Sequence, residues 1–270
     1  MRDIKRIDVI VISTPGSNRV FPLLEQLGKS NLFEIHILEA VMYSAEKFHA
    51  EIDQQGQQSI YGRKLADGEI GCAISHQKAY AIIKEIGNSA IILEDDARIP
   101  DLENFEKLAL LFMSKFSDGS HILSLLPWEH KNPCRGNNSI DLSTIFFLSG
   151  TSPLTVGYAI TLDAARELAS ANPGYKFLAD WPPSRVKYLS SIIGVINHGD
   201  EESGSTIQEF RDTKAKTEKK GILEVVILGF LRHKREFKSY SDYFKLKINP
   251  SVTWRIDDFR AKRIIKKLES

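Results

Sequence analysis

Three consecutive acidic residues, Glu94-Asp95-Asp96, directly follow a short apolar run and are the residues of this chain best suited to chemistry. The run Ala90–Leu93 is apolar throughout, which is typical of a parallel strand buried on both faces. Ligands of open α/β sheets bind at the carboxyl ends of such strands. Because neighbouring carboxylates repel one another, keeping them partly buried favours a compensating cation. A hard divalent metal that carries phosphates would suit them; the alternative is a solvated acidic turn.

A predicted helix over Gly68–Ile86 carries a second group of candidates. Cys72, Ser75 and His76 share one of its faces, because they are three and four residues apart. The cysteine and the histidine do not make a convincing nucleophile pair, since the sequence places no acid to orient the histidine. His76 is therefore either a packing and hydrogen-bonding residue or a substrate-facing one. Asp67 is expected to cap the helix.

Three further side chains stand near predicted strand ends or turns. Asp180 lies in a loop rich in Trp and Pro, where Trp181 offers an apolar face to a sugar ring; its alternative is a turn residue. His198 could be a metal ligand, a hydrogen-bond donor to phosphate or a structural residue. Arg19 suits a contact with phosphate or uracil, or a surface ion pair.

Apolar runs and turn signals predict the elements that position these residues. Strands are expected at Ile7–Ile12, Glu34–Leu38, Ile91–Leu93, His121–Leu126, Ile145–Leu148, Thr155–Thr161 and Ile192–Ile196, and helices at Val20–Lys29, Gly68–Ile86, Leu102–Phe116 and Asp163–Ala171. The opening strand–helix–strand unit predicts parallel pairing with a right-handed crossover. The fold class is therefore α/β with a mostly parallel central sheet.

Composition describes an ordinary globular protein of 270 residues, with 42% hydrophobic and 26% charged residues. The two cysteines, Cys72 and Cys134, have neither metal-site spacing nor disulfide-framework density, which favours a reducing compartment. We expect no signal peptide and no transmembrane helix, because the apolar stretches are too short. These features predict a cytoplasmic protein.

Charge is distributed unevenly along the chain. Residues 211–270 contain 17 Lys and Arg against 8 Asp and Glu, a net charge of +9, whereas residues 1–210 carry −8. We therefore expect a basic, largely helical appendage, with its clearest helix at Asp257–Leu268. Such an appendage can contact an anionic membrane surface or nucleic acid, or can be a solvated helical surface.

The order of two motifs resembles the signature of glycosyltransferase family 25. The first is Asp67-Gly68-Glu69-Ile70-Gly71-Cys72-Ala73-Ile74-Ser75-His76, and the second is Ile92-Leu93-Glu94-Asp95-Asp96-Ala97. Further matches are Arg19, Val156–Thr161 with Ala164-Ala165, Asp180, and Ser205-Thr206-Ile207. The resemblance covers about residues 5–210, and the basic appendage lies outside it.

The resemblance implies a GT-A-like nucleotide-sugar-binding domain over residues 1–210, followed by the appendage at 211–270. It also implies an inverting transfer from UDP-galactose or UDP-glucose, with lipooligosaccharide as the acceptor. Mn²⁺ or Mg²⁺ would bind Asp96, with His198 as a further ligand, and Asp180 is the candidate base for the acceptor hydroxyl. The residues expected on the donor are Ser13, Thr14, Arg19, Ser75, His76, Glu94 and Asp95. The loop after the first strand is Ser13-Thr14-Pro15-Gly16 in this chain, whereas relatives more often carry an Asn-Leu pair there.

Two other classes of function compete with this enzyme. A non-catalytic module of the same fold would bind a nucleotide or glycan, although the intact Glu94–Asp96 and Asp180 argue against it. A nucleic-acid binder would use the aromatic residues of the basic appendage, but no recognisable motif organises them, and nucleic acid is not the expected partner. A peripheral contact of the appendage with the inner face of the cytoplasmic membrane fits the enzyme hypothesis, since each Lys or Arg near an anionic surface adds about 1 kcal/mol of attraction. The alternative is that the appendage packs on the core.

Overall fold

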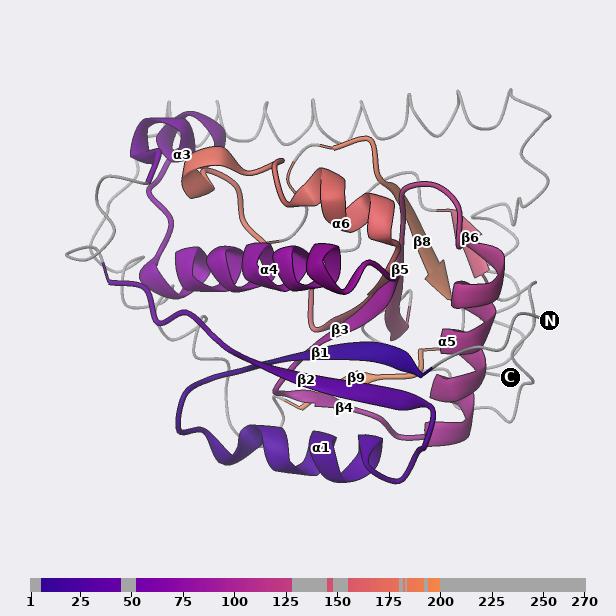
Figure 1. Cartoon of the computed structure of the whole chain (residues 1–270). Coiled ribbons are helices and arrows are strands. Elements are labelled where there is room, and N and C mark those ends of the chain that lie inside the picture. Colours follow the sequence, from indigo (N-terminus) through magenta and orange to yellow (C-terminus); the bar gives the residue numbers. More distant parts are fainter. Residues whose placement is uncertain are drawn as a thin grey trace, which may run out of the picture.

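A seven-stranded sheet with strand order β2-β1-β3-β7-β5-β8-β6 forms the centre of the molecule (Figure 1). The computed structural model describes residues 6–44, 52–127, 145–147, 155–179, 182, 184–191 and 194–199. The strands of this sheet are β1 (Ile7–Ser13), β2 (Phe33–Glu39), β3 (Ala90–Glu94), β5 (His121–Pro127), β6 (Ile145–Phe147), β7 (Gly157–Ile160) and β8 (Lys187–Ser191). All except β6 and β7 run in the same direction, which confirms the α/β class with a mostly parallel sheet.

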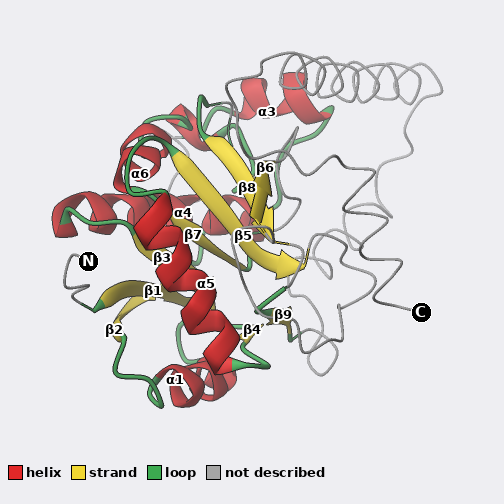
Figure 2. Ribbon diagram, turned by 90° about the vertical axis from the view of Figure 1, so that its right-hand side faces the viewer, coloured by secondary structure: helices red, strands yellow, loops and turns green. Residues whose placement is uncertain are grey.

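Helices cover both faces of the sheet. They are η1 (Asn18–Val20), α1 (Phe21–Leu27), α3 (Gln54–Tyr61), α4 (Asp67–Ile86), α5 (Leu102–Lys115), α6 (Leu162–Leu168) and η4 (Pro173–Tyr175). In Figure 1 α4 and α6 lie together above the sheet and α1 lies below it, and Figure 2 shows α5 in front of the strands. Along β3, Ile91 and Leu93 pack with α1 and α5, whereas Ala90 and Ile92 pack with α4 and α6. The strand is apolar at every position because both of its faces are buried.

The start of α4 differs from the expected cap. Asp67 is the first helical residue, and Ala66 occupies the cap position. The carboxylate of Glu69 accepts the backbone N–H of Ala66 at 2.8 Å and is held by two hydrogen bonds from Arg63. An acidic side chain therefore does accept a backbone N–H at the start of the helix, but it belongs to Glu69, the third helical residue, and not to Asp67.

Helix α4 passes very close to the chain that follows β2. A Cβ atom on Gly71 would lie 2.3 Å from the carbonyl oxygen of Val41. One turn later, the hydroxyl of Ser75 accepts the backbone N–H of Val41 at 2.8 Å and donates to the carbonyl of Gly71 at 2.7 Å. The absence of a side chain at position 71 thus allows the helix to anchor the end of the β1–β2 unit.

Helix α3 holds a segment that is distant from it in sequence. Gln57 is fully buried; its amide nitrogen donates to the carbonyl of Tyr175, and its amide oxygen accepts the N–H of Leu65, both at 3.0 Å. The N–H of Leu178 donates to the Tyr61 hydroxyl at 3.2 Å. Residues 175–178 therefore have a position fixed by α3.

The prediction of a strand at Ile192–Ile196 is wrong for residues 194–196, the part of this segment that the structure describes. Residues 194–196 are not a strand, and the N–H of Val195 donates to the carbonyl of Leu125 at 2.9 Å. The sheet strand is instead β8, which lies outside the predicted strands. Beyond it, β9 (Asn197–His198) pairs antiparallel with β4 (Ala97–Arg98).

The appendage predicted at 211–270 and the boundary at residue 210 lie outside the described residues. Within the residues that are described, no helix has both the length and the apolar composition that crossing a bilayer requires.

Replacing Gly71 with alanine should destabilise the protein. A Gly-to-Ala change inside a helix ordinarily stabilises it by about 1 kcal/mol. Here the new methyl group would meet a backbone oxygen, and overpacking of this kind costs about 1–3 kcal/mol. Urea denaturation of the Gly71→Ala variant should therefore give a lower free energy of unfolding than the wild type. Ala81→Gly, at an exposed position of the same helix, gives the ordinary propensity difference for comparison. Stabilisation by Gly71→Ala would show that the helix does not approach Val41 so closely.

Candidate functional site

The pairing of the central strands brings the acidic residues to one edge of the sheet. In the parallel pair β1–β3, Ile12 lies opposite Glu94, so both strands end at the same edge. In the antiparallel pair β3–β7, Leu93 lies opposite Gly157, so the beginning of β7 meets the end of β3. The acids, the loop after β1 and the residues that precede β7 therefore share this edge.

Glu94 is held by one neighbour on each side. Its Oε1 atom accepts the Thr155 hydroxyl at 2.8 Å and lies 3.2 Å from Nε2 of His76. Burial raises the pKa of Glu94, but the hydrogen bond and charge of His76 and the hydrogen bond of Thr155 together outweigh burial and bring the pKa below its ordinary value. Glu94 is therefore a fixed, ionised carboxylate at neutral pH.

Asp95 turns toward the loop that follows β1. Its Oδ2 atom accepts the backbone N–H of Thr14 at 2.9 Å, and its Oδ1 atom lies 3.8 Å from Nε of Arg19. The side chain is almost completely buried. A buried carboxylate that binds a backbone N–H fixes the position of the loop, so Asp95 joins β1 to the end of β3.

Asp96 has the least satisfied carboxylate of the three. Its Oδ2 atom accepts Nη2 of Arg19 at 2.6 Å and lies 3.4 Å from Nε2 of His198. Its Oδ1 atom is buried and has no hydrogen-bond partner within the part of the chain that the structure describes. Burial and then the charge of Glu94 raise the pKa of Asp96 to about 6, although His198 and Arg19 act in the opposite direction. Additional positive charge near Asp96 would stabilise its ionised carboxylate.

The short ribbon of β4 and β9 brings His198 to Asp96. Ala97 pairs with His198 across this ribbon, and the N–H of Gly199 donates to the carbonyl of Asp96 at 2.9 Å. A Cβ atom on Gly199 would lie 2.8 Å from that carbonyl oxygen. The glycine therefore allows the backbone beside His198 to approach the acidic turn.

His76 is 1% exposed and lies behind Glu94, with both ring nitrogens engaged. Its Nδ1 atom is 2.7 Å from the Tyr158 hydroxyl, which in turn donates to the Tyr80 hydroxyl at 3.1 Å. The rings of His76 and Tyr158 are stacked, with their centroids 5.7 Å apart. Burial, followed by the neighbouring Tyr80, raises the pKa of Tyr158 well above its ordinary value, so this hydroxyl stays protonated.

Comparison with known proteins assigns this arrangement to a family. The sequence profile of glycosyltransferase family 25, described as LPS biosynthesis proteins, matches residues 9–180, which is more than half of the chain. The chain belongs to glycosyltransferase family 25. A Haemophilus influenzae protein whose name assigns it provisionally to the glycosyltransferases is 29% identical over 130 residues, which cover 46% of this chain. Those residues cover 43% of that relative, so the match spans less than half of its length.

Most of the site residues predicted for the family 25 chain lie in one connected group. In this group His76 contacts Glu94, Thr14 and Arg19 contact Asp95, and Arg19 and His198 contact Asp96; the three acids are consecutive in the chain. Ser13 lies at the end of β1, where its carbonyl accepts the N–H of Ala40 at 2.8 Å. Ser75 lies apart, since its hydroxyl binds the backbone at Val41. Asp180 lies outside the described residues. The roles given to all of these residues remain predictions.

Three residues that contact this group, Tyr80, Thr155 and Tyr158, were not among the predicted site residues. Tyr80 lies one turn beyond His76 on the same face of α4, so the helical spacing could have found it. Thr155 and Tyr158 reach Glu94 and His76 because β7 runs antiparallel beside β3. No signal in their own segment predicts this strand order.

Asp96→Asn should stabilise the metal-free protein at neutral pH. The pKa of Asp96 is raised from 3.8 to about 6 on folding, so the folded state binds this proton more tightly than the unfolded state. Wild-type stability must then fall as pH rises from about 4 through about 6. The asparagine variant lacks this loss, and its free energy of unfolding in EDTA should exceed that of the wild type by on the order of 1–3 kcal/mol above about pH 7.

The difference should shrink toward zero near pH 4, as measured by urea denaturation at several pH values. Asp163→Asn, at an exposed position of α6, is the matched control for the removal of one carboxylate. A constant difference at all pH values would contradict the raised pKa.

Proposed function

We propose that this family 25 chain is a metal-dependent, inverting hexosyltransferase that moves galactose or glucose from a UDP-sugar to a hydroxyl of a lipooligosaccharide acceptor. The observation that carries the proposal is Asp96, which follows the carboxyl end of β3. Its carboxylate is buried and has a raised pKa, and one of its oxygens has no hydrogen-bond partner among the described residues. This edge of an α/β sheet is where ligands bind. Family membership supports a glycosyltransferase, which requires a nucleotide sugar and an acceptor.

The residues present at this edge fit a divalent cation. Asp96 offers an oxygen without a hydrogen-bond partner in the described structure, and the imidazole of His198 lies beside the same carboxylate. These two residues would hold Mn²⁺ or Mg²⁺, and the ion would neutralise the charge that develops on the departing diphosphate.

The neighbouring residues would bind and orient the donor. Glu94, held on one oxygen by two donors, is oriented to accept a ribose hydroxyl with the other oxygen. Asp95 fixes the loop after β1, and we assign the nucleotide contacts of Ser13 and Thr14 to this loop. Arg19 brings a positive charge to the place where the diphosphate would lie, since its guanidinium already contacts Asp95 and Asp96.

The general base is proposed to be Asp180. Inversion requires a group that removes the proton of the acceptor hydroxyl on the side opposite the leaving group. The support for Asp180 comes from the sequence, where it follows residues 175–178, the segment that α3 fixes in place.

The acceptor is proposed from the family description and from charge. Family 25 is described as LPS biosynthesis proteins, and a lipid-anchored anionic glycan suits the net charge of +9 on residues 211–270. Contact of these residues with the inner face of the cytoplasmic membrane is part of the same proposal.

A panel of UDP-sugars tests the reaction. The purified chain should release UDP from UDP-galactose or UDP-glucose with Mn²⁺ or Mg²⁺ and should lose this activity in EDTA. Asp96→Asn should lower the rate by at least about 10²-fold, because electrostatic stabilisation of the leaving group is lost. Asp163→Asn should keep the wild-type rate. Full activity in EDTA would rule out the metal, and metal-dependent UDP binding without turnover would favour a binding module.

Asp180→Asn separates chemistry from donor binding. Removing a general base lowers the rate by about 10²–10⁴-fold. We therefore expect a loss of this size in transfer to a lipooligosaccharide acceptor, with UDP affinity unchanged in calorimetry. A variant that loses UDP affinity instead would assign Asp180 to the nucleotide site or to the fold.

A further inference from the structure

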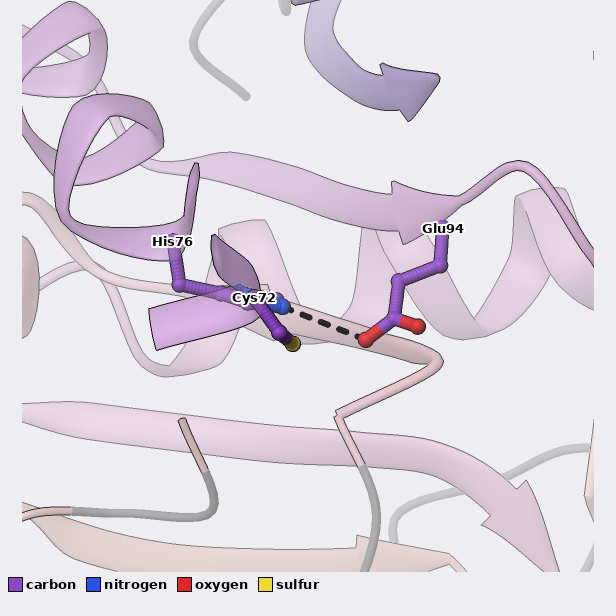
Figure 3. A group of neighbouring side chains, drawn as sticks. All are labelled: Cys72, His76 and Glu94. Atoms are coloured by element: carbon purple, nitrogen blue, oxygen red, sulfur yellow. Dashed lines mark hydrogen bonds and ion pairs between the residues drawn. The ribbon is translucent and has the colours of Figure 1, made fainter. Parts of the chain in front are cut away.

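Cys72, His76 and Glu94 bring a sulfur, a nitrogen and an oxygen together beside the acidic turn. One potential ligand atom from each residue lies within 4.8 Å of the other two. Figure 3 shows the first two side chains reaching from α4 toward the carboxylate at the end of β3. The contact is possible because residues 72 and 76 are one helical turn apart and share a face. This group is referred to below as the cysteine cluster.

The hydrogen bonds behind His76 determine which of its nitrogens is available. Nδ1 of His76 lies 2.7 Å from the Tyr158 hydroxyl, which can accept a proton from it because this hydroxyl donates its own proton to Tyr80. Nε2 of His76 faces Oε1 of Glu94, 3.2 Å away, and donates a hydrogen bond to it in the absence of metal. A divalent metal ion can replace this Nε2 proton, because the proton of the imidazole can then stay on Nδ1 and the lone pair of Nε2 is left for the metal.

The supporting contacts favour the metal ion. Histidine ligands usually donate their other ring N–H to a fixed partner, and ligand carboxylates are themselves hydrogen-bonded. Tyr158 supplies the first kind of partner, and Thr155 supplies the second through its 2.8 Å bond to Glu94.

Burial and charge also agree with a metal ion of charge +2. His76 is deeply buried, whereas Cys72 is partly exposed and the Glu94 side chain is 22% exposed, so an ion has a route to the cluster. A thiolate and a carboxylate carry two negative charges, which one divalent ion neutralises in this poorly hydrated place.

We propose that the cysteine cluster is a binding site for Zn²⁺ or a similar thiophilic divalent metal. Thiolate, imidazole and carboxylate are the ligands that Zn²⁺ takes, and three protein ligands leave one tetrahedral position for water or substrate. The soft sulfur ligand distinguishes this site from the one at Asp96 and His198, which offers oxygen and nitrogen but no sulfur. If Glu94 binds a ribose hydroxyl as proposed above, metal and donor compete for it. The test therefore contains no donor and does not depend on the proposed function.

Cobalt is the probe, because a thiolate bound to Co²⁺ gives a charge-transfer band in the near ultraviolet. Titration of the metal-free full chain, in a non-thiol reductant, should produce this band together with intense visible bands of a tetrahedral ion. Both should saturate at one equivalent and disappear when Zn²⁺ is added. Asp96→Asn should leave the bands unchanged.

The two cysteines of the chain provide matched variants. Cys72→Ser and Cys72→Ala should each abolish the charge-transfer band, and Cys134→Ser should keep it, with circular dichroism confirming that all three fold. Tyr158→Phe should keep the band but weaken Co²⁺ affinity by about 10–100-fold, as loss of a contact behind a ligand usually does. A wild-type titration without the band, or a band lost in Cys134→Ser and kept in Cys72→Ser, would overturn the proposal.

Discussion

The concentration of negative charge at the end of a buried strand is the constraint on which the rest of this structure depends. Burial of β3 on both faces fixes where its three carboxylates lie, and their mutual repulsion requires that each finds a separate partner. Glu94 turns to α4 and β7, Asp95 to the loop after β1, and Asp96 to Arg19 and β9. Segments from most of the described chain therefore converge on one short turn.

Close backbone approach makes this convergence possible. Glycine occupies three places of close approach. Gly71 lies where α4 crosses the chain after β2, Gly157 lies where β7 packs against Ile196, and Gly199 follows β9 where it meets the backbone of Asp96. At Gly157 a Cβ atom would lie 2.3 Å from Ile196 and 2.8 Å from Leu93. These residues carry no chemistry of their own, but side chains at these positions would push the functional groups apart.

The sequence predicts what depends on local pattern. The α/β class, the β1–β2 crossover, helix α4 and the position of Glu94–Asp96 at a strand end follow from apolar periodicity and from the rule that parallel strands end at a shared edge. The residues grouped around these acids come from the resemblance to the family. Strand order is a different matter, since it depends on packing between distant segments. The sequence therefore gives no warning that β7 lies antiparallel beside β3, and Thr155 was missed. It also misassigns residues 194–196. The apolar side chains of Val195 and Ile196 resemble those of a strand, but both of their N–H groups donate to the carbonyl of Leu125 in β5.

The hold of α3 on residues 175–178 has a consequence for exchanging parts between relatives. Gln57 and Tyr61 bind main-chain groups of residues 118 and 117 positions later, so two segments that look independent in the sequence form one structural unit. A chimaera that takes the 175–178 segment from another member of the family must take α3 as well. Otherwise the buried amide of Gln57 would face a backbone of different shape and lose its hydrogen bonds.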